Sequence, residues 1–307
     1  MSDGRTFKRA LVLVNPEAGG ANRGRFETAF ESEAGGIEHR IRRLEAGEDA
    51  EEVTRRELGG KWDVVLAAGG DGTVSGVARA ARLTDTPVAI APLGTGNILA
   101  DQLGIPSDIN QAIRLLKGDW AVRRIDAMEI GGRLYLLNAG VGLSASTVRD
   151  VKGDDKRRFG LTAYLWTGLA RSFTFRPVRC TVTVDGRSRR LRVLDVSIIN
   201  AGFRIDRPMP GMPEVKPDDG MLDVLIVWAP RPLEYLRHLE RGLFHMRGIN
   251  ANIQWKTAEK EIRIACADRI PVQADGDLIA ETPITVRVVP DAVGIVVPAA
   301  RVCAERT

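Results

Sequence analysis

In the N-terminal part of the chain, short apolar runs alternate with amphipathic stretches, in which apolar and polar residues are mixed. Apolar runs of about five residues predict strands that are covered on both faces. Between them, Ile109, Ala112, Ile113 and Leu116 form a clear helical stripe, with Ser107 as its expected N-cap. We predict strands at 10–15, 37–44, 64–68 and 87–92, and helices at 25–34, 48–58, 73–83 and 107–118. This alternation is typical of an α/β domain with a doubly wound parallel sheet.

After about residue 126 the pattern changes to closely spaced strands. The dipeptides Gly131-Gly132 and Asp185-Gly186 are typical of hairpin turns. Strand-like segments lie at 127–142, 180–184, 191–200, 222–228, 260–266, 271–279 and 284–289, and helical segments at 161–172 and 233–246. This half is predicted to be a mainly β-sandwich domain. We expect residues 1–126 to form the first domain, residues 127–290 to form the second, and 291–307 to return to the first.

Three loops rich in Gly or Asn follow predicted strands, at 15–20, 69–73 and 94–97. Ligands of doubly wound sheets bind outside the carboxyl ends of the strands, where such loops lie. Glycine leaves no Cβ between backbone N–H groups and a ligand, and a helix N-terminus favours an anion. Asp71 would repel a phosphate unless a cation lies between them. The loops therefore predict a nucleotide bound with a divalent metal.

Length and composition bear on the number of domains, on membrane insertion and on the cellular compartment. With 307 residues, 44% hydrophobic and 27% charged, the chain is long enough for one large or two ordinary domains. No apolar run approaches the roughly 20 residues that a membrane-spanning helix needs, and the N-terminus lacks the layout of a signal peptide. Cys180, Cys266 and Cys303 show no metal-ligand spacing and no disulfide framework. We therefore expect a cytoplasmic protein.

Positive charge is concentrated between Arg149 and Arg192, a segment that contains twelve Lys or Arg residues and only four Asp residues. The segment is either a solvated face or a surface for an anionic partner. No RNA-binding signature or zinc finger is present, so we rank an anionic membrane surface above nucleic acid. Trp166, Phe173 and Phe175 lie in the same segment, and either core packing or a membrane-facing patch would explain them.

The motifs together resemble a known family. Neither a P-loop nor the protein-kinase motif set is present. In chain order, however, the sequences Asn15-Pro16-Glu17-Ala18-Gly19, Gly69-Gly70-Asp71-Gly72-Thr73, Gly94-Thr95-Gly96-Asn97 and Asp275-Gly276-Asp277 resemble the diacylglycerol kinase catalytic superfamily. That superfamily includes soluble bacterial lipid kinases of the YegS type, sphingosine kinases and ceramide kinases. The resemblance spans nearly the whole chain.

The resemblance implies an ATP- and Mg²⁺-dependent lipid kinase. Its acceptor would be a hydroxyl of diacylglycerol, a sphingoid base or a related lipid. The first domain would then be an NAD-kinase-like nucleotide-binding domain, and the second would take the lipid substrate. Expected partners are ATP, the lipid and, peripherally, an anionic membrane surface, but no nucleic acid; a homodimer stays open.

The resemblance also implies roles for individual residues. Asp71, Asp126 and Asp275 would share the catalytic Mg²⁺ network. Asp277 would accept the proton of the substrate hydroxyl, although the family usually has glutamate there and Asp71 is an alternative base. ATP would contact Asn15, Pro16, Glu17, Ala18, Gly19, Gly70, Asp71, Gly72, Thr73 and Thr95, and a structural Mg²⁺ would be bound by Lys216, Asp219 and Met221.

Simpler explanations exist for each acidic residue. Asp71 could cap the following helix, Asp126 and Asp277 could be solvated turn residues, and Asp275-Gly276 and Asp219-Gly220 could be plain turns. Two other functions also stay open. One is a kinase of a soluble acceptor, as in NAD kinases. The other is a nucleotide- or lipid-binding module without catalysis. Its only support is that Asp277 and Ser75-Gly76 depart from the family pattern.

Overall fold

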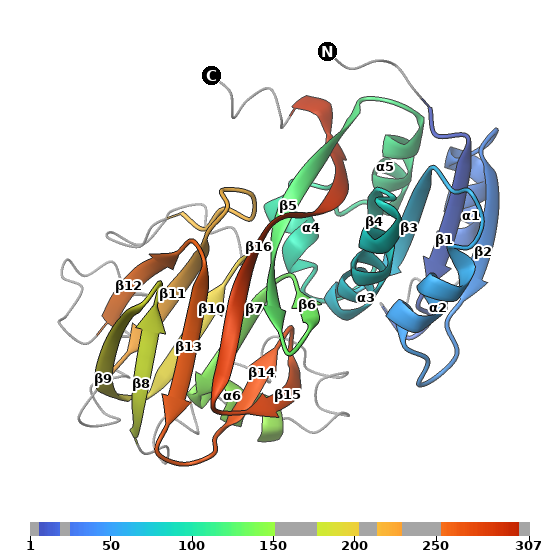
Figure 1. Cartoon of the computed structure of the whole chain (residues 1–307). Coiled ribbons are helices and arrows are strands. Elements are labelled where there is room, and N and C mark those ends of the chain that lie inside the picture. The colour runs from blue at the N-terminus through green and yellow to red at the C-terminus, as the bar shows by residue number, and fades with distance from the viewer. Residues whose placement is uncertain (1–5, 19–24, 151–176, 203–213, 229–252, 301–307) are drawn as a thin grey trace, which may run out of the picture. The chain divides into compact units, whose positions relative to one another are not determined.

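The computed structural model of the chain describes residues 6–18, 25–150, 177–202, 214–228 and 253–300 (Figure 1). The predicted helices at 161–172 and 233–246 lie outside these ranges. The chain divides into two units. The N-terminal unit comprises residues 1–125 and 291–307, and the C-terminal unit comprises residues 126–290.

The N-terminal unit contains a parallel sheet with strand order β2-β1-β3-β4-β16. Its strands are β1 (Arg9–Val14), β2 (Glu38–Arg43), β3 (Val64–Gly69), β4 (Val88–Pro92) and the last part of β16 (Ile284–Pro298). Its helices are α1 (Arg25–Glu33), α2 (Ala50–Glu57), α3 (Asp71–Ala81), α4 (Ile98–Gln102) and α5 (Ile109–Arg114), with short 3₁₀ turns η2 (Arg82–Thr84) and η3 (Leu115–Lys117). The predicted α/β fold class is confirmed.

Helices cover both faces of this sheet, as the continuous apolar runs require. Phe26 and Phe30 of α1 and Ile113 of α5 pack with Val12 and Leu66 on one face. Because side chains alternate along a strand, the intervening residues of β1 and β3 point to the other face. There α2 and α3 pack against each other and against the strands. Strands of this kind are buried on both sides, which explains why no polar alternation marks them in the sequence.

The N-cap of α5 and the helix α4 differ from the sequence-based expectations. Asp108, not the expected Ser107, caps α5, and its carboxylate accepts the N–H of Gln111 at 2.9 Å. Both residue types are good caps, so only the backbone geometry distinguishes them. The short helix α4 was not predicted, because it has only five residues and begins after Asn97 in a left-handed conformation (φ 47°).

The C-terminal unit consists of two sheets of antiparallel strands. One has the order β16-β13-β8-β9 and also contains β5 and β6, and the other has the order β12-β11-β10-β7-β14-β15. Its elements are β5 (Trp120–Ile130, entering from the N-terminal unit), β6 (Arg133–Tyr135), β7 (Asn138–Gly142), α6 (Leu143–Asp150), β8 (Val178–Val184), β9 (Arg187–Val193), β10 (Asp195–Ile199), β11 (Leu222–Val227), β12 (Ile253–Ala258), β13 (Glu261–Cys266), β14 (Pro271–Ala274) and β15 (Asp277–Glu281). The predicted single strands at 191–200 and 271–279 are each two strands.

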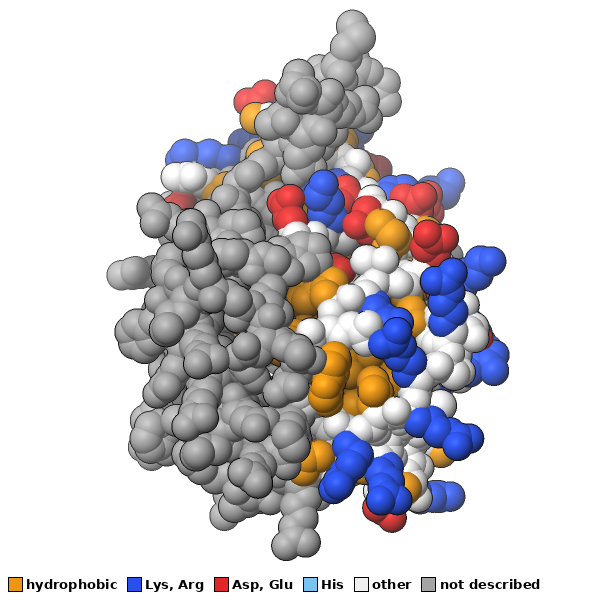
Figure 2. Space-filling model, turned by 90° about the vertical axis from the view of Figure 1, so that its left-hand side faces the viewer, with side chains coloured by type: hydrophobic (Ala, Val, Ile, Leu, Met, Phe, Trp, Pro, Cys, Tyr) orange, Lys and Arg blue, Asp and Glu red, His pale blue; other side chains and the backbone are white. Residues whose placement is uncertain are grey.

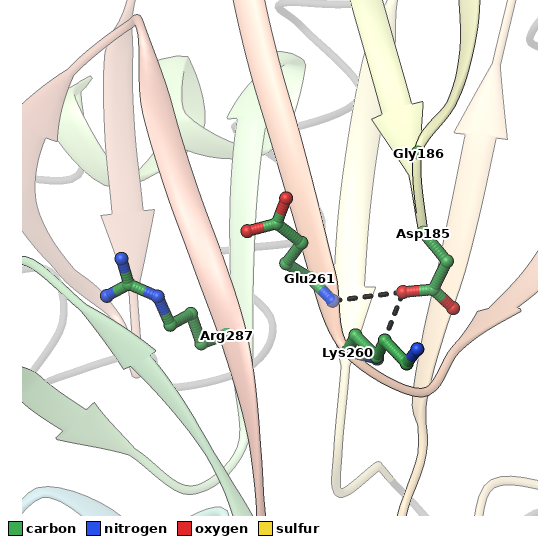
Figure 3. A pocket seen from close by; sticks show the side chains of 5 residues that line it. All are labelled: Asp185, Gly186, Lys260, Glu261 and Arg287. Carbon is green, nitrogen blue, oxygen red and sulfur yellow. Dashed lines mark hydrogen bonds between the residues drawn. The ribbon is translucent and has the colours of Figure 1, made fainter.

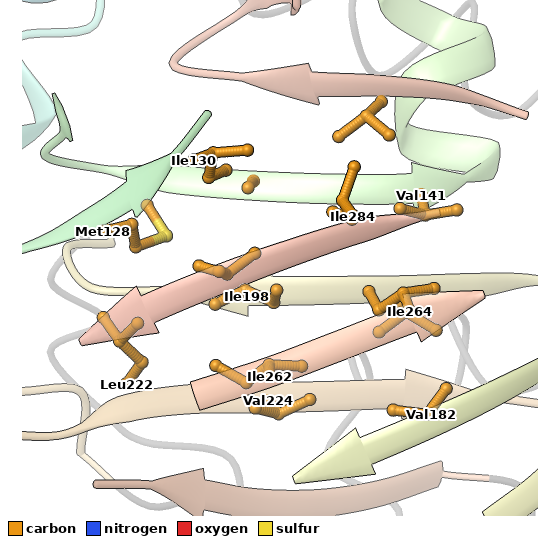
Figure 4. Close-up of a cluster of buried hydrophobic side chains, with 14 of the residues drawn as sticks. Met128, Ile130, Val141, Val182, Ile198, Leu222, Val224, Ile262, Ile264 and Ile284 are labelled. Atoms are coloured by element: carbon orange, nitrogen blue, oxygen red, sulfur yellow. The ribbon is translucent and has the colours of Figure 1, made fainter. Parts of the chain in front are cut away.

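The inner faces of the two sheets share one apolar core (Figure 4). Ile262 and Ile264 of β13 meet Ile198 of β10 and Val224 of β11, and all four are at most 1% exposed. Burial of such a side chain contributes about 1.5–3 kcal/mol. This arrangement confirms the predicted β-sandwich.

The expectation of no disulfide is wrong. Cys180 of β8 lies directly opposite Cys266 of β13, and their sulfur atoms are bonded at 2.09 Å. The two residues are 86 positions apart, and only the pairing of two strands that are not consecutive brings them together. The spacing of the two cysteines along the sequence does not indicate that they are in contact. The cysteines therefore no longer support the expected cytoplasmic location, because disulfides are rare in the reducing cytoplasm.

Candidate functional site

Three predicted ligand loops meet at one edge of the N-terminal sheet. Since β1, β3 and β4 are parallel, their carboxyl ends lie together, with Val14 opposite Ala68 and Gly69 opposite Pro92. The chain stays paired just beyond the strands, because the N–H of Asn15 donates to Ala68 O at 2.9 Å and that of Leu93 donates to Gly69 O at 3.0 Å. The segments 15–18, 70–73 and 94–97 are thus neighbours. Gly19 lies outside the described residues.

Asn15 joins the first loop to the second. Its side-chain Nδ2 donates to Thr73 Oγ1 at 3.0 Å, and its Oδ1 accepts the N–H of Glu17 at 2.9 Å, which shapes the turn through Pro16 and Ala18. The bond joins the loop after β1 to the first turn of α3, the helix that follows β3. The chain goes from β1 to β2 on one side of the sheet and returns to β3 on the other side of β1, so this is the position where the strand order switches sides. Ligand sites of doubly wound sheets lie at this position.

Two glycines at this edge are required by packing. A Cβ on Gly94 would lie 2.5 Å from Gly70 Cα, and a Cβ on Gly69 would lie 2.6 Å from Thr73 Oγ1. Gly72, in contrast, is exposed and has nothing within 4 Å of the position of a Cβ. The fold therefore does not need a glycine at position 72. The open space beside it lies at the N-terminus of α3, where N–H groups favour an anion.

Asp71 is the first residue of α3 and is half-buried. The N-cap of this helix is Gly70, with no side-chain capping bond. The carboxylate of Asp71 instead reaches the third loop, where it accepts the N–H of Leu99 at 3.4 Å and lies 2.9 Å from the position of a Cβ on Gly96. Asp71 thus extends from the second loop toward Gly96 of the third loop.

Asn97 is part of the Gly94–Asn97 motif, but the sequence analysis gave it no role, and the structure shows that it shapes the loop. Its Oδ1 accepts the N–H of Gly94 at 2.9 Å, and its Nδ2 donates to Gly94 O at 2.7 Å. The side chain therefore closes the third loop on itself. The signal was present in the sequence, since Asn is the residue besides Gly that readily takes the left-handed conformation.

The residues at this edge fit a nucleotide phosphate with a cation. Glycine removes side chains from the loops, α3 presents its N-terminus, and Asp71 supplies one carboxylate. Within the described ranges no group of three or more His, Cys, Asp or Glu side chains could hold a metal ion. A Mg²⁺ here would therefore take one or two carboxylates together with phosphate and water oxygens, which is its usual coordination beside a nucleotide.

In the C-terminal unit, Asp275-Gly276 forms the turn of the β14–β15 hairpin, with both residues at positive φ (49° and 86°). The Asp275 carboxylate accepts backbone N–H groups from Leu136 (3.0 Å), Leu137 (2.9 Å) and Asn138 (3.3 Å). It therefore holds the segment between β6 and β7 against the hairpin. Asp277, the first residue of β15, is exposed.

Gln273 orders the same hairpin and was not predicted. It is 5% exposed, donates through Nε2 to Asn138 Oδ1 at 2.9 Å, and accepts the N–H of Gly276 through Oε1 at 3.2 Å. A buried glutamine must have such partners. In the sequence, Gln273 is noticeable only as a polar residue in an otherwise apolar segment. In the structure, it holds the turn that leads from Asp275 to Asp277.

Asp126 is buried, at 2% exposure, and is not a solvated turn residue. Its carboxylate accepts the N–H of Gly220 at 2.7 Å, and its own N–H donates to Pro217 O at 2.6 Å. Asn200 links it to the segment that Asp275 holds, because Asn200 Nδ2 donates to both Asp126 O and Leu136 O at 2.8 Å. Asp126 therefore anchors the loop for which a structural Mg²⁺ was predicted.

That loop presents oxygen atoms of the kind a hard cation takes. Lys216 and Asp219 are exposed, and the Asp219 carboxylate accepts the N–H of Met221 at 3.1 Å. Nearby, Asp223 is buried and accepts Trp255 Nε1–H at 2.6 Å. Burial raises the pKa of Asp223, and the negative charge of Asp219 raises it further, against the opposing effect of the Trp255 bond.

The C-terminal unit also has a depression of about 430 Å³ beside the β8–β9 turn (Figure 3). It is lined by Asp185, Gly186, Lys260, Glu261 and Arg287. Burial would raise the pKa of Asp185, but N–H groups of Glu259, Lys260 and Glu261 at 2.8–3.0 Å together lower it. This carboxylate serves the turn, and none of the predicted site residues lines the depression.

Two family models match the chain. The model of the diacylglycerol kinase catalytic domain matches residues 9–130, and that of the YegS C-terminal NAD kinase beta sandwich-like domain matches residues 138–297. The first match contains the three glycine- and asparagine-rich loops and Asp126. The second contains the Asp275–Asp277 turn and the loop at 216–221.

Relatives and solved structures agree. A "Probable lipid kinase YegS-like" from Pseudomonas syringae pv. tomato is 30% identical over 83% of this chain and 82% of its own length. A protein of the same name from Pseudomonas aeruginosa PAO1 is 28% identical over 95% of both chains.

Two solved structures from Bacillus anthracis str. Sterne share the fold. One reaches a TM-score of 0.79 at 24% identity, covering 96% of this chain and 97% of that chain. The other, described as a diacylglycerol kinase, reaches 0.72 at 21% identity, covering 96% and 99%. With both family models and the 30% identical relative in agreement, the chain belongs to the YegS-like lipid kinases, phosphotransferases with an alcohol group as acceptor and a diacylglycerol kinase catalytic domain.

Proposed function

We propose that this lipid kinase uses ATP and Mg²⁺ to phosphorylate a hydroxyl of diacylglycerol, a sphingoid base or a related lipid. One observation carries the proposal: three loops meet at one sheet edge, where Gly72 leaves open space at the N-terminus of α3 and the carboxylate of Asp71 reaches toward the third loop. Phosphoryl transfer depends mainly on positioning and charge stabilisation, so a cradle of backbone N–H groups and a carboxylate supply much of what it needs.

The N-terminal unit would bind ATP. Asn15 fixes the first loop to Thr73, and Gly72 leaves open space at the N-terminus of α3 for a phosphate. Asp71 would hold Mg²⁺, which when bound offsets the negative charge that develops on the phosphoryl oxygens. Pro16, Glu17, Ala18, Gly19, Gly70 and Thr95 complete the proposed ATP contacts.

The C-terminal unit would supply groups that act on the acceptor. In the proposed reaction, the acceptor hydroxyl loses its proton to a carboxylate, its oxygen bonds to the γ-phosphorus of ATP, and ADP leaves. Asp277 is the proposed base because it is exposed on a turn that Gln273 and Asp275 hold in place. Asp126 and Asp275 would join the Mg²⁺ network, and Lys216, Asp219 and Met221 would bind a second, structural Mg²⁺.

We also propose that the protein contacts an anionic membrane surface, where its lipid substrate would reside, from the cytoplasmic side, although the Cys180–Cys266 disulfide does not support a reducing compartment. None of the helices in the described part of the chain has both the length and the apolar character needed to cross a bilayer. The open possibility of a homodimer is tested by measuring the mass of the purified protein in solution.

The test is transfer of radiolabelled γ-phosphate from ATP-Mg²⁺ to a panel of lipids in anionic micelles, with NAD as a soluble acceptor in a parallel reaction. We expect labelled lipid and no labelled NAD. Labelled NAD without labelled lipid would establish the soluble-acceptor alternative. ATP binding in a calorimeter without transfer to any acceptor would establish a non-catalytic module.

A further inference from the structure

We propose that the outer face of the β8–β9 hairpin, formed by Arg179, Arg190 and Arg192, binds an anionic lipid surface. The inference rests on the proposed function, because it names the surface through which a lipid kinase would reach its substrate. We call these three residues the arginine face.

Strand register places the three side chains together. Arg179 of β8 lies directly opposite Arg192 of β9, and Arg190 lies opposite Thr181. Val182 and Val184, which belong to the sandwich core, lie at the alternate positions of β8. Since side chains alternate along a strand, Arg179 points away from the core, as do its cross-strand neighbour Arg192 and, two positions away, Arg190. All three are exposed.

Among the residues that the structure describes, no acidic side chain forms an ion pair with this face. Strands β8 and β9 contain no Asp or Glu. Farther along the same sheet, Arg263 pairs with Glu261 at 2.7 Å and Arg287 pairs with Glu129 at 3.1 Å. Within the described ranges, none of the three residues of the arginine face has such a pair. In the described part of this sheet, the arginines of β13 and β16 are therefore ion-paired with glutamates, whereas the three arginines of the arginine face are not.

The direct pair of Arg179 and Arg192 favours an anionic partner over a purely structural role. Like charges directly opposite each other in a sheet are destabilising. Charges on an edge strand can protect it from pairing with other chains, and β9 is such a strand. Edge protection, however, does not explain Arg179, which lies one strand farther in. An anionic surface that contacts both strands explains all three.

The shape and chemistry of the face favour a lipid surface over nucleic acid. Strands β8 and β9 contain no aromatic residue, whereas single-stranded nucleic acids are bound largely through stacking on aromatic side chains. Guanidinium groups on an open sheet face can reach many lipid phosphates at once. Figure 2 views the side of the molecule where β8 and β9 lie, and Lys and Arg side chains gather there beside apolar ones.

The test is sedimentation of the full chain with vesicles of phosphatidylcholine alone or with about one third phosphatidylglycerol. Each basic residue near an anionic surface contributes about 1 kcal/mol, or about fivefold in binding. The triple variant R179Q/R190Q/R192Q should therefore bind anionic vesicles roughly 100-fold more weakly. Raising the salt from about 0.1 M to about 1 M shortens the screening length from about 10 Å to about 3 Å and should release the wild-type protein.

The matched control is R55Q/K61Q/R82Q, which removes the same charge from exposed residues of the N-terminal unit. It should bind vesicles nearly as the wild type does. Equal losses in both triple variants would show that net charge alone matters and would overturn the proposal. So would unchanged binding by R179Q/R190Q/R192Q, absence of wild-type binding to anionic vesicles, or tighter binding to duplex DNA than to vesicles.

Two further measurements keep the outcome clear. Thermal unfolding shows whether the triple variant is folded; if it is not, R190Q alone, which faces Thr181, should still lose about fivefold in binding. Kinase activity of the wild type on a short-chain diacylglycerol without vesicles tests the proposed function separately. Vesicle binding that depends on the arginine face, in a protein without kinase activity, would refute the function and leave the inference standing.

Discussion

The glycine-rich edge of the N-terminal unit and the aspartate sites of the C-terminal unit use similar sequences in opposite ways. In Gly70-Asp71-Gly72, Gly70 packs against Gly94, Gly72 leaves open space, and the Asp71 carboxylate reaches toward Gly96 and Leu99. In Asp275-Gly276, the glycine forms a turn, and the carboxylate accepts three backbone N–H groups. An aspartate next to glycine can therefore hold a segment of the fold through backbone hydrogen bonds, as Asp275 does, or extend its carboxylate toward a neighbouring loop, as Asp71 does.

This difference has an energetic consequence. A hydrogen bond to a charged group contributes about 1.5–3 kcal/mol to stability. Loss of the Asp275 carboxylate should therefore destabilise the protein, whatever it also does to catalysis. Loss of charge at Asp71 should act mainly on activity, because that carboxylate is placed beside loops that the fold keeps open.

The largest effect is expected from Asp71→Asn. Asparagine keeps the size of the side chain but loses the charge that would hold Mg²⁺, and charge stabilisation by a metal is worth several kcal/mol, so turnover should fall roughly 10³-fold. The measurement is the rate of lipid phosphorylation at saturating ATP, together with the melting temperature, which should stay close to the wild-type value.

The control for this variant is Asp101→Asn, an exposed acidic residue on α4 of the same unit. It should leave both rate and melting temperature unchanged. If Asp71→Asn keeps full activity, or if it mainly lowers the melting temperature, Asp71 belongs with the structural aspartates and the comparison fails.

Asp275→Ala should give the next largest effect, this time on stability. Three N–H groups of Leu136, Leu137 and Asn138 would lose their acceptor, at a cost of about 2–3 kcal/mol for buried groups left unpaired. Denaturant unfolding measures the change. Asp277→Ala on the exposed neighbouring position is the control and should cost less than about 0.5 kcal/mol. Equal stability of the two variants would contradict a structural role for Asp275.

The smallest effect concerns Asp195, a buried carboxylate of β10 that accepts the Ser144 N–H at 2.8 Å and the Ser197 hydroxyl at 2.5 Å. Burial raises its pKa, although both hydrogen bonds oppose the rise. A raised carboxyl pKa means that stability is greatest below the pKa of the unfolded chain and is lost as the pH rises through the folded pKa. Asp195→Asn removes this titration.

The stability of the wild type relative to Asp195→Asn should therefore decline as the pH rises from the ordinary carboxyl pKa, about 4, through the raised pKa of Asp195. Melting temperatures of both proteins across this range measure the decline. A difference that does not vary with pH would show that Asp195 titrates in the folded state as it does in the unfolded chain.

Patterns that are local in the sequence predicted much of the fold. Strands β1, β3 and β4 were visible as apolar runs, and α5 as a stripe of period 3.6, because burial on a sheet or helix face acts on neighbouring residues. The loops after these strands could be placed at one sheet edge for the same reason. Strand boundaries at 191–200 failed, since a turn at Leu194 carries no glycine or proline signal.

Contacts between distant residues could not be predicted. The partners of Asp275 lie 137 to 139 positions away, and Cys180 and Cys266 meet only through strand register. Asp126 could be named as a site residue, but its bond to Gly220 depends on how the loop at 216–221 folds over β5. Gln273 was missed because a single polar residue in a strand says nothing about which groups it will face.

The most direct test of the central claim, that the N-terminal edge is cleared for phosphate, is Gly72→Ala. A Cβ at this position meets no atom within 4 Å, and alanine favours a helix over glycine, so the fold should be unchanged or slightly more stable. Titration calorimetry with ATP-Mg²⁺ should nevertheless show affinity at least about tenfold weaker, a loss of about 1.4 kcal/mol. Unchanged ATP affinity in a folded Gly72→Ala protein would contradict the account.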